Sequence, residues 1–470
     1  MTLSSQSTPS TYQQGALVEV EISDLNHDGA GVGRFEGRVV FVPDTVVGDR
    51  LVVRLVQVKR QYAIGKLHEL LQPSPHRVRP SCIVADKCGG CQWQHIDYEF
   101  QLEVKRNQVV QALERIGGFE QPPVDPVLAV APALGYRNKA TYPLRQVAVQ
   151  AHEKSTDLYR IQAGYYRKGS HQLVNLNQCP IQDERLNPLL AEVKQDIAQR
   201  EWSIYDEEKH RGTLRHLGLR IGRRTGEMLL TLVAQSDRLP GLAEQAQEWM
   251  ARYPGLVGVA LNLNPARTNA IFGEETRCIA GQSFLMEQFA GLHFQIHPTT
   301  FFQVNTEQAE ALLEVILAEL KPQGTELLLD VYSGVGTLTL PLAKRVKQAI
   351  ALEIQPEAIA QAQQNATLNG ITNATFERGA VEEQLPSLPV QPDIVLLDPP
   401  RKGCAPAVLE TLLNWLPQQI VYVSCNPSTL ARDLKVLCND GQYQLTRVQP
   451  ADFFPQTAHV ECAAFLKRLA

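Results

Sequence analysis

The chain has 470 residues, of which 44% are hydrophobic and 20% charged, a composition typical of a folded globular protein with two or three domains. No stretch approaches the roughly 18 consecutive apolar residues of a membrane span, so we expect no membrane segment. The formal net charge of −5 argues against a protein that coats nucleic acid with its whole surface.

The first fourteen residues are rich in Ser, Thr and Gln and lack the apolar core of a signal peptide. We therefore expect a disordered tail over residues 1–14 in a cytoplasmic protein. The nine cysteines agree with that compartment, because an odd number without a secretory signal favours reduced thiols or metal ligands over a disulfide framework.

Residues 15–74 are predicted to form several short strands. Apolar residues alternate over 18–22 and 51–55, a third apolar run covers 39–42, and glycines between residues 29 and 33 mark bends. Short strands with glycine bends are typical of a small β-barrel of the oligonucleotide-binding (OB) kind.

Positive charge gathers between residues 50 and 87, where eight Lys and Arg residues face only two acids, Glu69 and Asp86. Such a stripe in an acidic protein is typical of a phosphate-binding surface. A solvated strand face gives the same pattern, and charge alone does not separate the two interpretations.

Residues 75–285 form a central region that opens with a proline-rich linker and a cysteine-rich loop. Apolar positions at helical spacing over 97–116 predict a helix that ends at a pair of glycines. Strand-like runs at 217–221, 228–233 and 258–262 indicate an α+β arrangement.

Four cysteines of this region form a candidate metal-binding set. Cys82, Cys88 and Cys91 lie in one loop, and the distant Cys179 precedes a proline. Four soft thiolates suit either a tetrahedral zinc ion or an iron–sulfur cluster, and spacing alone does not separate them. Four other cysteines have no motif and are assigned to packing: Cys278, Cys404, Cys438 and Cys462.

From residue 286 to 470 strands and helices alternate, which predicts a doubly wound, mainly parallel sheet of the Rossmann-like α/β kind. The chain is expected to end in a pair of strands. The predicted strands cover 327–329, 349–352, 393–397, 420–423, 443–448 and 460–466, and the predicted helices 338–346, 356–368 and 407–415.

Residues 330–337 lie between a predicted strand and a predicted helix, the context of a nucleotide-binding turn. Gly334 and Gly336 let the backbone approach a ligand, and Glu353, at the end of the next strand, can accept hydrogen bonds from ribose hydroxyls. The turn lacks the third glycine of the dinucleotide GxGxxG pattern, which suits a cofactor without a pyrophosphate. S-adenosylmethionine is the natural candidate, and a purely structural turn is the alternative.

A lone cysteine, Cys425, ends an apolar run and precedes a helix that we predict to begin at Pro427. A thiol at the carboxyl end of a strand faces the ligand crevice of such a sheet, and a helix amino terminus stabilises a thiolate. Together with the cofactor turn, this indicates methyl transfer through a covalent cysteine adduct. Without further support, a cysteine in this position is more often a core residue.

Five segments, in this order, resemble the RNA uracil-5-methyltransferases, notably the iron–sulfur-containing enzymes that act on 23S ribosomal RNA. The resemblance covers nearly the whole chain, because the N-terminal barrel is similar to that family's TRAM domain and the cysteine loop to its cluster site. The segments are Thr300–Asn305, Asp330–Thr337, Leu397–Gly403, Ser424–Pro427 and His459–Glu461.

The resemblance implies roles for individual residues. Cys425 is the nucleophile that adds to uracil C6, Glu461 is the base that removes the C5 proton, and Asp398 contacts cofactor and reacting ring. The cysteine set (Cys82, Cys88, Cys91 and Cys179) would hold a structural 4Fe–4S cluster. The residues implied in binding S-adenosylmethionine are Gln303, Asp330, Tyr332, Gly334, Gly336, Thr337, Glu353 and Asp398.

Two positions depart from the family's pattern. Thr337 stands where an asparagine is common, and Ala380 stands where a polar side chain often meets the adenine. Cofactor contacts at these positions would come from the backbone.

The resemblance also implies an RNA substrate, with 23S ribosomal RNA favoured over a transfer RNA uridine, and nothing in the sequence demands more than a monomer. Extruding a stacked uridine costs about a few kcal/mol, which phosphate contacts from the barrel would offset. Phe301 and Phe302 either stack on a base or fill the core, and we expect at least one in the core. The candidate RNA contacts are Lys59, Arg60, Lys66, Arg77 and Arg79, extended by Arg137, Lys139 and Arg215.

Two competing interpretations involve other classes of protein. An amino-methyltransferase is suggested by Asp398-Pro399-Pro400, but that chemistry needs no thiol. A non-catalytic RNA-binding factor of ribosome assembly would keep the fold and the cluster, and the intact set of Cys425, Glu461 and Asp398 argues against it.

Overall fold

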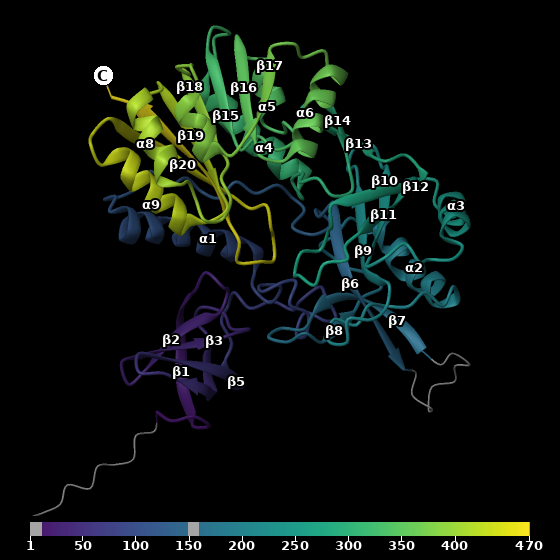
Figure 1. Cartoon of the computed structure of the whole chain (residues 1–470). Coiled ribbons are helices and arrows are strands. Elements are labelled where there is room, and N and C mark those ends of the chain that lie inside the picture. The colour runs from purple at the N-terminus through teal and green to yellow at the C-terminus, as the bar shows by residue number, and fades with distance from the viewer. Residues whose placement is uncertain (1–11, 149–158, 470) are drawn as a thin grey trace, which may run out of the picture.

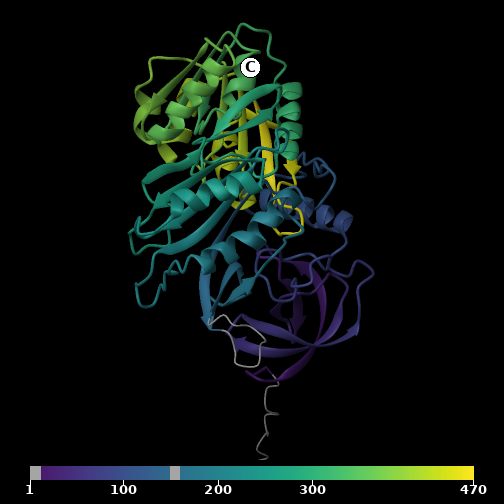
Figure 2. The same ribbon diagram turned by 90° about the vertical axis from the view of Figure 1, so that its right-hand side faces the viewer.

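The computed structural model describes residues 12–148 and 159–469, which form three parts. Figure 1 shows the N-terminal barrel below the C-terminal domain, with the central sheet beside them; Figure 2, a view turned by 90°, shows the three parts one above another. Of the tail expected over residues 1–14, residues 1–11 lie outside the described part of the chain. Tyr12 is buried under the guanidinium of Arg38, so the ordered barrel begins before residue 15.

The N-terminal part is a closed five-stranded barrel, as its alternating sequence predicts. Val18, Val20 and Ile22 point into its core, whereas the residues between them are exposed. Gly33 is required by close packing, because a Cβ there would lie 2.1 Å from a methyl group of Val20. The strands are β1 (Leu17–Leu25), β2 (Gly31–Phe35), β3 (Arg38–Val42), β4 (Arg50–Val58) and β5 (Tyr62–Gln72), in the order β1-β2-β3-β5-β4.

The central part is a seven-stranded sheet in the order β12-β11-β10-β9-β6-β7-β8. The three strand-like runs of the sequence correspond to β9, β10 and β11, which are buried along most of their length. The strands are β6 (Lys139–Ala148), β7 (Tyr159–Tyr166), β8 (Leu173–Asn175), β9 (Leu214–Ile221), β10 (Met228–Ala234), β11 (Leu256–Leu263) and β12 (Glu275–Gly281); the helices are η2 (Glu184–Leu186), α2 (Asn187–Gln199) and α3 (Leu242–Arg252).

The C-terminal domain has the predicted doubly wound sheet, with strand order β17-β16-β15-β18-β19-β21-β20. The strands from β17 to β19 are parallel, and β21 joins antiparallel to β19. The strands are β15 (Leu327–Val331), β16 (Gln348–Glu353), β17 (Ala374–Arg378), β18 (Ile394–Leu397), β19 (Gln419–Ser424), β20 (Tyr443–Ala451) and β21 (Glu461–Arg468), preceded by the hairpin β13 (Leu285–Phe289) and β14 (Leu292–Ile296).

Helices cover both faces of this sheet in Figure 1. The helix predicted over 338–346 is shorter, because α5 spans only Thr339–Ala343. No helix among the residues that the structure describes is long and apolar enough to cross a membrane. The remaining helices are α4 (Thr306–Leu320), α6 (Pro356–Leu368), α7 (Val381–Gln384), η3 (Leu385–Ser387), α8 (Pro406–Trp415) and α9 (Pro427–Cys438).

The first long helix, α1 (Tyr98–Ala112), packs on the C-terminal domain and not on the central sheet with which we grouped it. It continues into a π-helical turn, η1 (Leu113–Gly117). Val109 and Leu113 share a core with Leu430 and Leu434 of α9, and Figure 1 shows α1 beneath α9. The C-terminal domain is therefore completed by a segment from before the central sheet.

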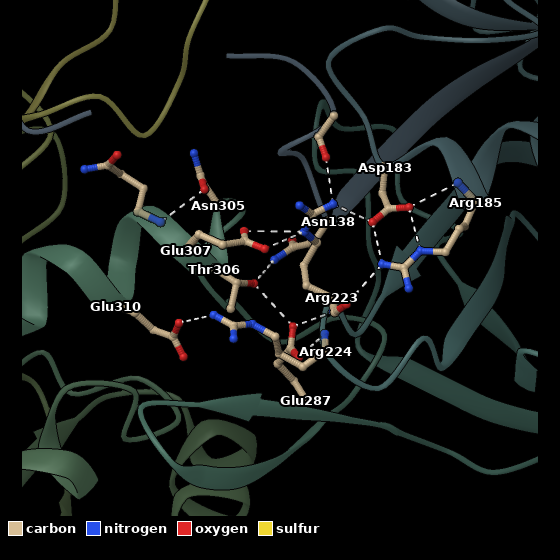
Figure 3. A network of polar contacts seen from close by, with 12 residues as sticks. Asn138, Asp183, Arg185, Arg223, Arg224, Glu287, Asn305, Thr306, Glu307 and Glu310 are labelled. Atoms are coloured by element: carbon tan, nitrogen blue, oxygen red, sulfur yellow. Dashed lines mark hydrogen bonds and ion pairs between the residues drawn. The ribbon is translucent and has the colours of Figure 1, made fainter. Parts of the chain in front are cut away.

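A polar network joins the central part to the start of α4 (Figure 3). The Arg223 guanidinium lies between the carboxylates of Asp183 and Glu307. Buried Glu287 accepts hydrogen bonds from the Arg223 backbone N–H and from the Thr306 hydroxyl. Because these groups come from four separate elements, the network fixes the segment just before α4, which includes Gln303.

Candidate active site

A cavity of about 490 Å³ opens at the carboxyl ends of β15, β16, β18 and β19, where parallel sheets place their ligands. Most residues implied by the sequence meet in it, although they come from six separate segments. The lining includes Gln303, Tyr332, Gly334, Glu353, Asp398, Cys425 and Glu461, whereas Asp330, Gly336, Thr337 and Ala380 lie outside the lining.

The turn after β15 is organised by Glu353 at the end of β16. One carboxylate oxygen accepts a hydrogen bond of 2.9 Å from the backbone N–H of Gly334. The other oxygen accepts bonds of 2.8 Å from the backbone N–H groups of Ile354 and Gln355. The oxygen bonded to Gly334 keeps a second lone pair, so the carboxylate can still accept a hydroxyl group from a ligand.

Asp330 supports the turn from below. Its carboxylate is buried and accepts a hydrogen bond from the hydroxyl of Thr339 in α5. Burial, together with repulsion from Glu353, raises the pKa of Asp330 to about 7. Its position suits an anchor for α5 better than a direct ligand contact, and a cofactor contact by Asp330 stays a prediction.

Tyr332 adopts a φ of +81°, a left-handed conformation that side chains other than glycine rarely occupy. Its hydroxyl lies beside Cys404, whose backbone N–H donates a 2.9 Å hydrogen bond to buried Asp433 of α9. Asp433 also accepts a 2.6 Å bond from the Tyr422 hydroxyl. Sequence reasoning missed Asp433, which links the cofactor turn, β19 and the loop after Asp398.

Cys425 lies between β19 and α9, at the end of the sheet where we predicted it. Asn426 caps α9 by accepting a 3.0 Å bond from the backbone N–H of Ser428. The lining of the cavity acts against the stabilisation of the thiolate that we expect from the helix terminus. Burial, with Glu461 and Asp398 nearby, raises the pKa of Cys425 to about 11, and Arg401 only partly opposes this.

Glu461 and Asp398, two of the carboxyl groups that line the cavity, also have raised pKa values. Burial and the charge of Asp398 raise the pKa of Glu461 to about 8. Burial and the charge of Asp330 raise the pKa of Asp398 to about 7. Carboxyl groups with such pKa values can take up and release protons near neutral pH, as general acid–base catalysis requires.

The segment 452–459 contributes Phe454 and His459 to the cavity, and sequence reasoning singled out only its last residue, His459. It is held by side chains from before the central sheet. Lys105 of α1 lies 2.6 Å from the Asp452 carboxylate, and Gln101 bonds the backbone and side chain of Gln456. Only a signal that pairs residues more than 300 positions apart could have revealed these contacts.

The aromatic pair before Gln303 divides between core and surface. Phe302 is 3% exposed and packs against Phe289 and Phe294, which confirms that at least one of the pair fills the core. Phe301 is 66% exposed at the edge of the cavity. An exposed ring beside a reaction cavity is suited to stacking on a nucleobase.

Comparisons with known proteins match this geometry. The sequence profile described as tRNA (uracil-5-)-methyltransferase matches residues 274–469, and that of the TRAM domain matches residues 12–68. An uncharacterized RNA methyltransferase of Nostoc sp. is 67% identical over 98% of this chain and 98% of its own length. One of Bacillus cereus is 39% identical over 99% of this chain and all of its own length.

A solved structure extends the likeness to the whole fold. The tRNA (uracil-54, C5)-methyltransferase of Pyrococcus abyssi, in complex with S-adenosyl-L-homocysteine, superposes with a TM-score of 0.75 at 30% identity. The match covers 96% of this chain and 100% of that one. The chain belongs to the RNA uracil-5-methyltransferase family.

In this RNA methyltransferase the four cysteines of the candidate metal set lie near one another. Burial, with Cys179, Cys88 and Cys82 close by, raises the pKa of Cys91 to about 12. Cys88 accepts a hydrogen bond of 3.4 Å from the Gly90 backbone, and burial also raises the pKa of Cys179. Among the described residues, however, no three His, Cys, Asp or Glu side chains are arranged to hold a single metal ion.

Four free cysteines are the donor type of both a zinc ion and an iron–sulfur cluster. Buried, mutually repelling thiols favour the thiolate state only with cationic metal present, and N–H donors such as Gly90 are typical of the surroundings of such thiolates.

The basic residues of the methyltransferase fall into two groups. Lys59, Arg60, Lys66 and Arg79 are exposed and stay candidates for RNA contacts. Arg77 instead forms an ion pair with buried Asp49 of the barrel. The interpretation of Arg215 as a phosphate contact was wrong, because its buried guanidinium donates to the backbone carbonyls of residues 264, 266 and 268.

Arg137 and Lys139 lie at the start of β6, close to the segment that carries Gln303. The intervening Asn138 donates a 2.8 Å hydrogen bond to the backbone carbonyl of Gln303 and a 3.0 Å bond to Thr306 (Figure 3). Burial, with Arg220 and Arg137 nearby, lowers the pKa of Lys139 to about 6. A lysine so shifted is mostly uncharged at neutral pH, which weakens its case as a phosphate contact.

Proposed function

We propose that this RNA methyltransferase transfers a methyl group from S-adenosylmethionine to C5 of a uridine in RNA, through a transient bond between Cys425 and uracil C6. One observation supports this most directly: Cys425, Glu461 and Asp398, which are remote in sequence, line one cavity with the turn after β15. The bound cofactor would supply an electrophilic methyl group on its sulfonium.

The proposed reaction balances with the groups that line the cavity. The Cys425 thiol loses its proton to water and its sulfur adds to C6, which makes C5 a carbon nucleophile. C5 then takes the methyl group as the bond between methyl and sulfonium sulfur breaks, which leaves a neutral thioether. Glu461, as a carboxylate, then removes the C5 proton, and the C6–S bond breaks to restore the ring and release the thiolate. Asp398 lies close enough to Glu461 and Cys425 to influence both pKa values, so it is placed to modulate these proton transfers.

Substitution of the nucleophile and the base separates the steps. We expect Cys425→Ala to form no 5-methyluridine while still binding RNA, and Glu461→Gln to accumulate a covalent protein–RNA species on a denaturing gel. Cys278→Ala, at an exposed cysteine of β12, is the matched control and should keep wild-type activity. Full activity of Cys425→Ala would refute the cysteine adduct; a missing covalent species would remove only Glu461 as the base.

We propose 23S ribosomal RNA as the substrate, supported by the four-cysteine set that resembles the iron–sulfur enzymes acting on that RNA. A transfer RNA uridine is the second candidate, because the solved relative from Pyrococcus abyssi is a tRNA (uracil-54, C5)-methyltransferase. Mapping 5-methyluridine in both RNA classes of a deletion strain decides between them. Loss from 23S ribosomal RNA supports the proposal, whereas loss from transfer RNA alone overturns it.

We also propose that Cys82, Cys88, Cys91 and Cys179 hold a 4Fe–4S cluster that pins the central part to the cysteine loop. Protein purified without oxygen should be brown, with the broad visible absorption of thiolate-ligated iron, and should contain iron and sulfide. Cys88→Ser should remove most of that absorption, whereas Cys438→Ser should not. A colourless protein that contains zinc would overturn the cluster.

A further inference from the structure

Strands β4 and β5 and the turn between them, which carries Lys59 and Arg60, form a basic hairpin of the barrel that lies far from the reaction cavity. Strand β1 runs antiparallel to β4, with Leu17 opposite Arg54 and Glu21 opposite Arg50. The β4–β5 turn, with Lys59 and Arg60, therefore lies at the end of the barrel where β1 begins. The nine residues of β1 separate it from the β1–β2 turn by on the order of 25–30 Å.

The opposite end of the barrel faces the nucleophile. A groove of about 540 Å³ runs between residues 24–28, one face of α1 and residues 425–428. It shares Arg401, Cys425 and His459 with the reaction cavity, so Cys425 is accessible from both sides. The cofactor turn occupies the other side of the cavity, which leaves this groove as the side from which a polynucleotide can approach Cys425.

The side chains in the groove are unlike a phosphate track. Asp24 and Asp28 contribute two carboxylates, which repel phosphate. Amide groups of Gln108 and Gln111 on α1 lie beside them, and Arg115 of η1 and Arg401 are the arginines that line the groove. Carboxylates accept hydrogen bonds from the amino groups of bases, and glutamine amides pair with base edges, so this set suits nucleobases.

The turn that carries Asp28 is held in place before any ligand binds. The side chain of Asn26 accepts hydrogen bonds from the backbone N–H groups of Asp28 (3.1 Å) and Ala30 (2.8 Å). Gln108 of α1 donates a 3.2 Å bond to the Asn26 carbonyl. The Asp28 side chain itself is 75% exposed and lies 3.4 Å from the neighbouring His27.

The turn is also electrostatically connected to the reaction cavity. Burial, Arg401 and Lys105 lower the pKa of His459, and the charge of Asp28 works against them. Asp28 therefore lies close to a residue that lines both the groove and the cavity. A base bound against Asp28 would be a near neighbour of the base that reaches Cys425.

We propose that the groove between residues 24–28, α1 and Cys425 recognises the bases that flank the target uridine in an unstacked RNA segment, whereas the basic hairpin binds distant backbone phosphates without regard to sequence. This inference rests on the proposed function. It assigns the choice of uridine to Asp24, Asp28 and Gln111, and the general affinity for RNA to Lys59 and Arg60.

The test compares a groove variant, Asp28→Ala with Gln111→Ala, and a hairpin variant, Lys59→Ala with Arg60→Ala. For each variant, kcat/KM for methylation is measured on the RNA that the wild-type protein modifies and on versions of that RNA with changed bases beside the uridine. We expect the groove variant to lose roughly 10-fold or more of the kcat/KM ratio between the original and the changed RNAs. The hairpin variant should keep that ratio, bind all RNAs more weakly, and show a shallower salt dependence, by about 0.7 in the log–log slope per lost contact.

Reversing the charge of Asp28 distinguishes recognition of bases from the competing explanation, in which the groove binds phosphates, because the two predict opposite changes in activity. If the groove held phosphates, Asp28→Lys would bind every RNA more tightly and steepen the salt dependence; this result, or an unchanged kcat/KM ratio in the groove variant, overturns the inference. We expect Asp28→Lys to weaken methylation of the original RNA instead. If wild-type protein itself forms no 5-methyluridine in any RNA, the proposed function has failed, which is a distinguishable result.

Discussion

A buried ion pair helps to hold the segment 452–459 against the cavity, and its removal should be costly. The side chains of Lys105 and Asp452 are both 0% exposed and lie 2.6 Å apart. The Lys105 amine also donates to the Phe454 carbonyl, and the Tyr98 hydroxyl donates a 3.0 Å bond to Asp452. Burial lowers the pKa of Lys105, and the charge of Asp452 works against that shift.

Removing one partner leaves an uncompensated buried charge. We expect Lys105→Met to lower the free energy of unfolding by about 3–5 kcal/mol, and Asp452→Asn to do the same. The double variant, in which both groups are neutral, should recover most of the loss, because an apolar replacement of a buried pair is often nearly neutral. Lys467→Met breaks an exposed pair with Glu319 and should change stability by at most about 1 kcal/mol.

Urea unfolding followed by tryptophan fluorescence measures these differences, since Trp93 lies 5.8 Å from the Lys105 amine. Because Phe454 and His459 line the cavity, the single variants should also raise the KM for RNA. The reasoning is refuted if Lys105→Met and Lys467→Met lose similar stability. It is also refuted if the double variant is as unstable as the sum of the single ones.

The raised pKa of Glu461, about 8, and an exposed phenylalanine give two further expectations. As the proposed base, Glu461 must be ionised, so kcat/KM should rise with pH through about 8. The stability from its raised pKa is fully present below the unfolded value near 4.5 and is lost as pH rises through about 8. Melting temperatures of Glu461→Gln should therefore fall less between pH 7 and 9 than those of wild type. Phe301→Ala should raise the KM for RNA by roughly 5-fold or more, the value of one stacked base, and leave the melting temperature unchanged. Phe302→Leu should lower the melting temperature and leave the KM for RNA unchanged.

The sequence predicted the C-terminal domain well because its elements are locally encoded. Buried parallel strands such as β15 and β18 read as short apolar runs, and each ends at a residue of the cavity. The edge strand β17 was missed, because half of it is exposed and polar. No local pattern shows that α1 packs on α9, since the contact between Val109 and Leu430 spans most of the chain.

Charge was the least reliable guide to the surface. Arg77 and Arg215 look like phosphate contacts in the sequence, yet both guanidinium groups satisfy partners inside the protein. The sequence shows where charged residues occur, but the solvent exposure of each side chain depends on the whole fold. The groove at the other end of the barrel escaped notice for the opposite reason: Asp24 and Asp28 would never be selected by a search for positive charge.

The electrostatics of the cavity favour the neutral thiol of Cys425. Burial and the neighbouring carboxyl groups raise its pKa to about 11, so the thiol is mostly protonated at pH 7, the form that is less readily oxidised. The neighbouring Asp398 and Glu461 that cause this shift also favour any cation that enters the cavity. A bound cation would in turn lower the pKa of all three groups, because binding and proton release are thermodynamically linked. We therefore expect that the proposed nucleophile is activated by ligand binding as well as by the helix terminus.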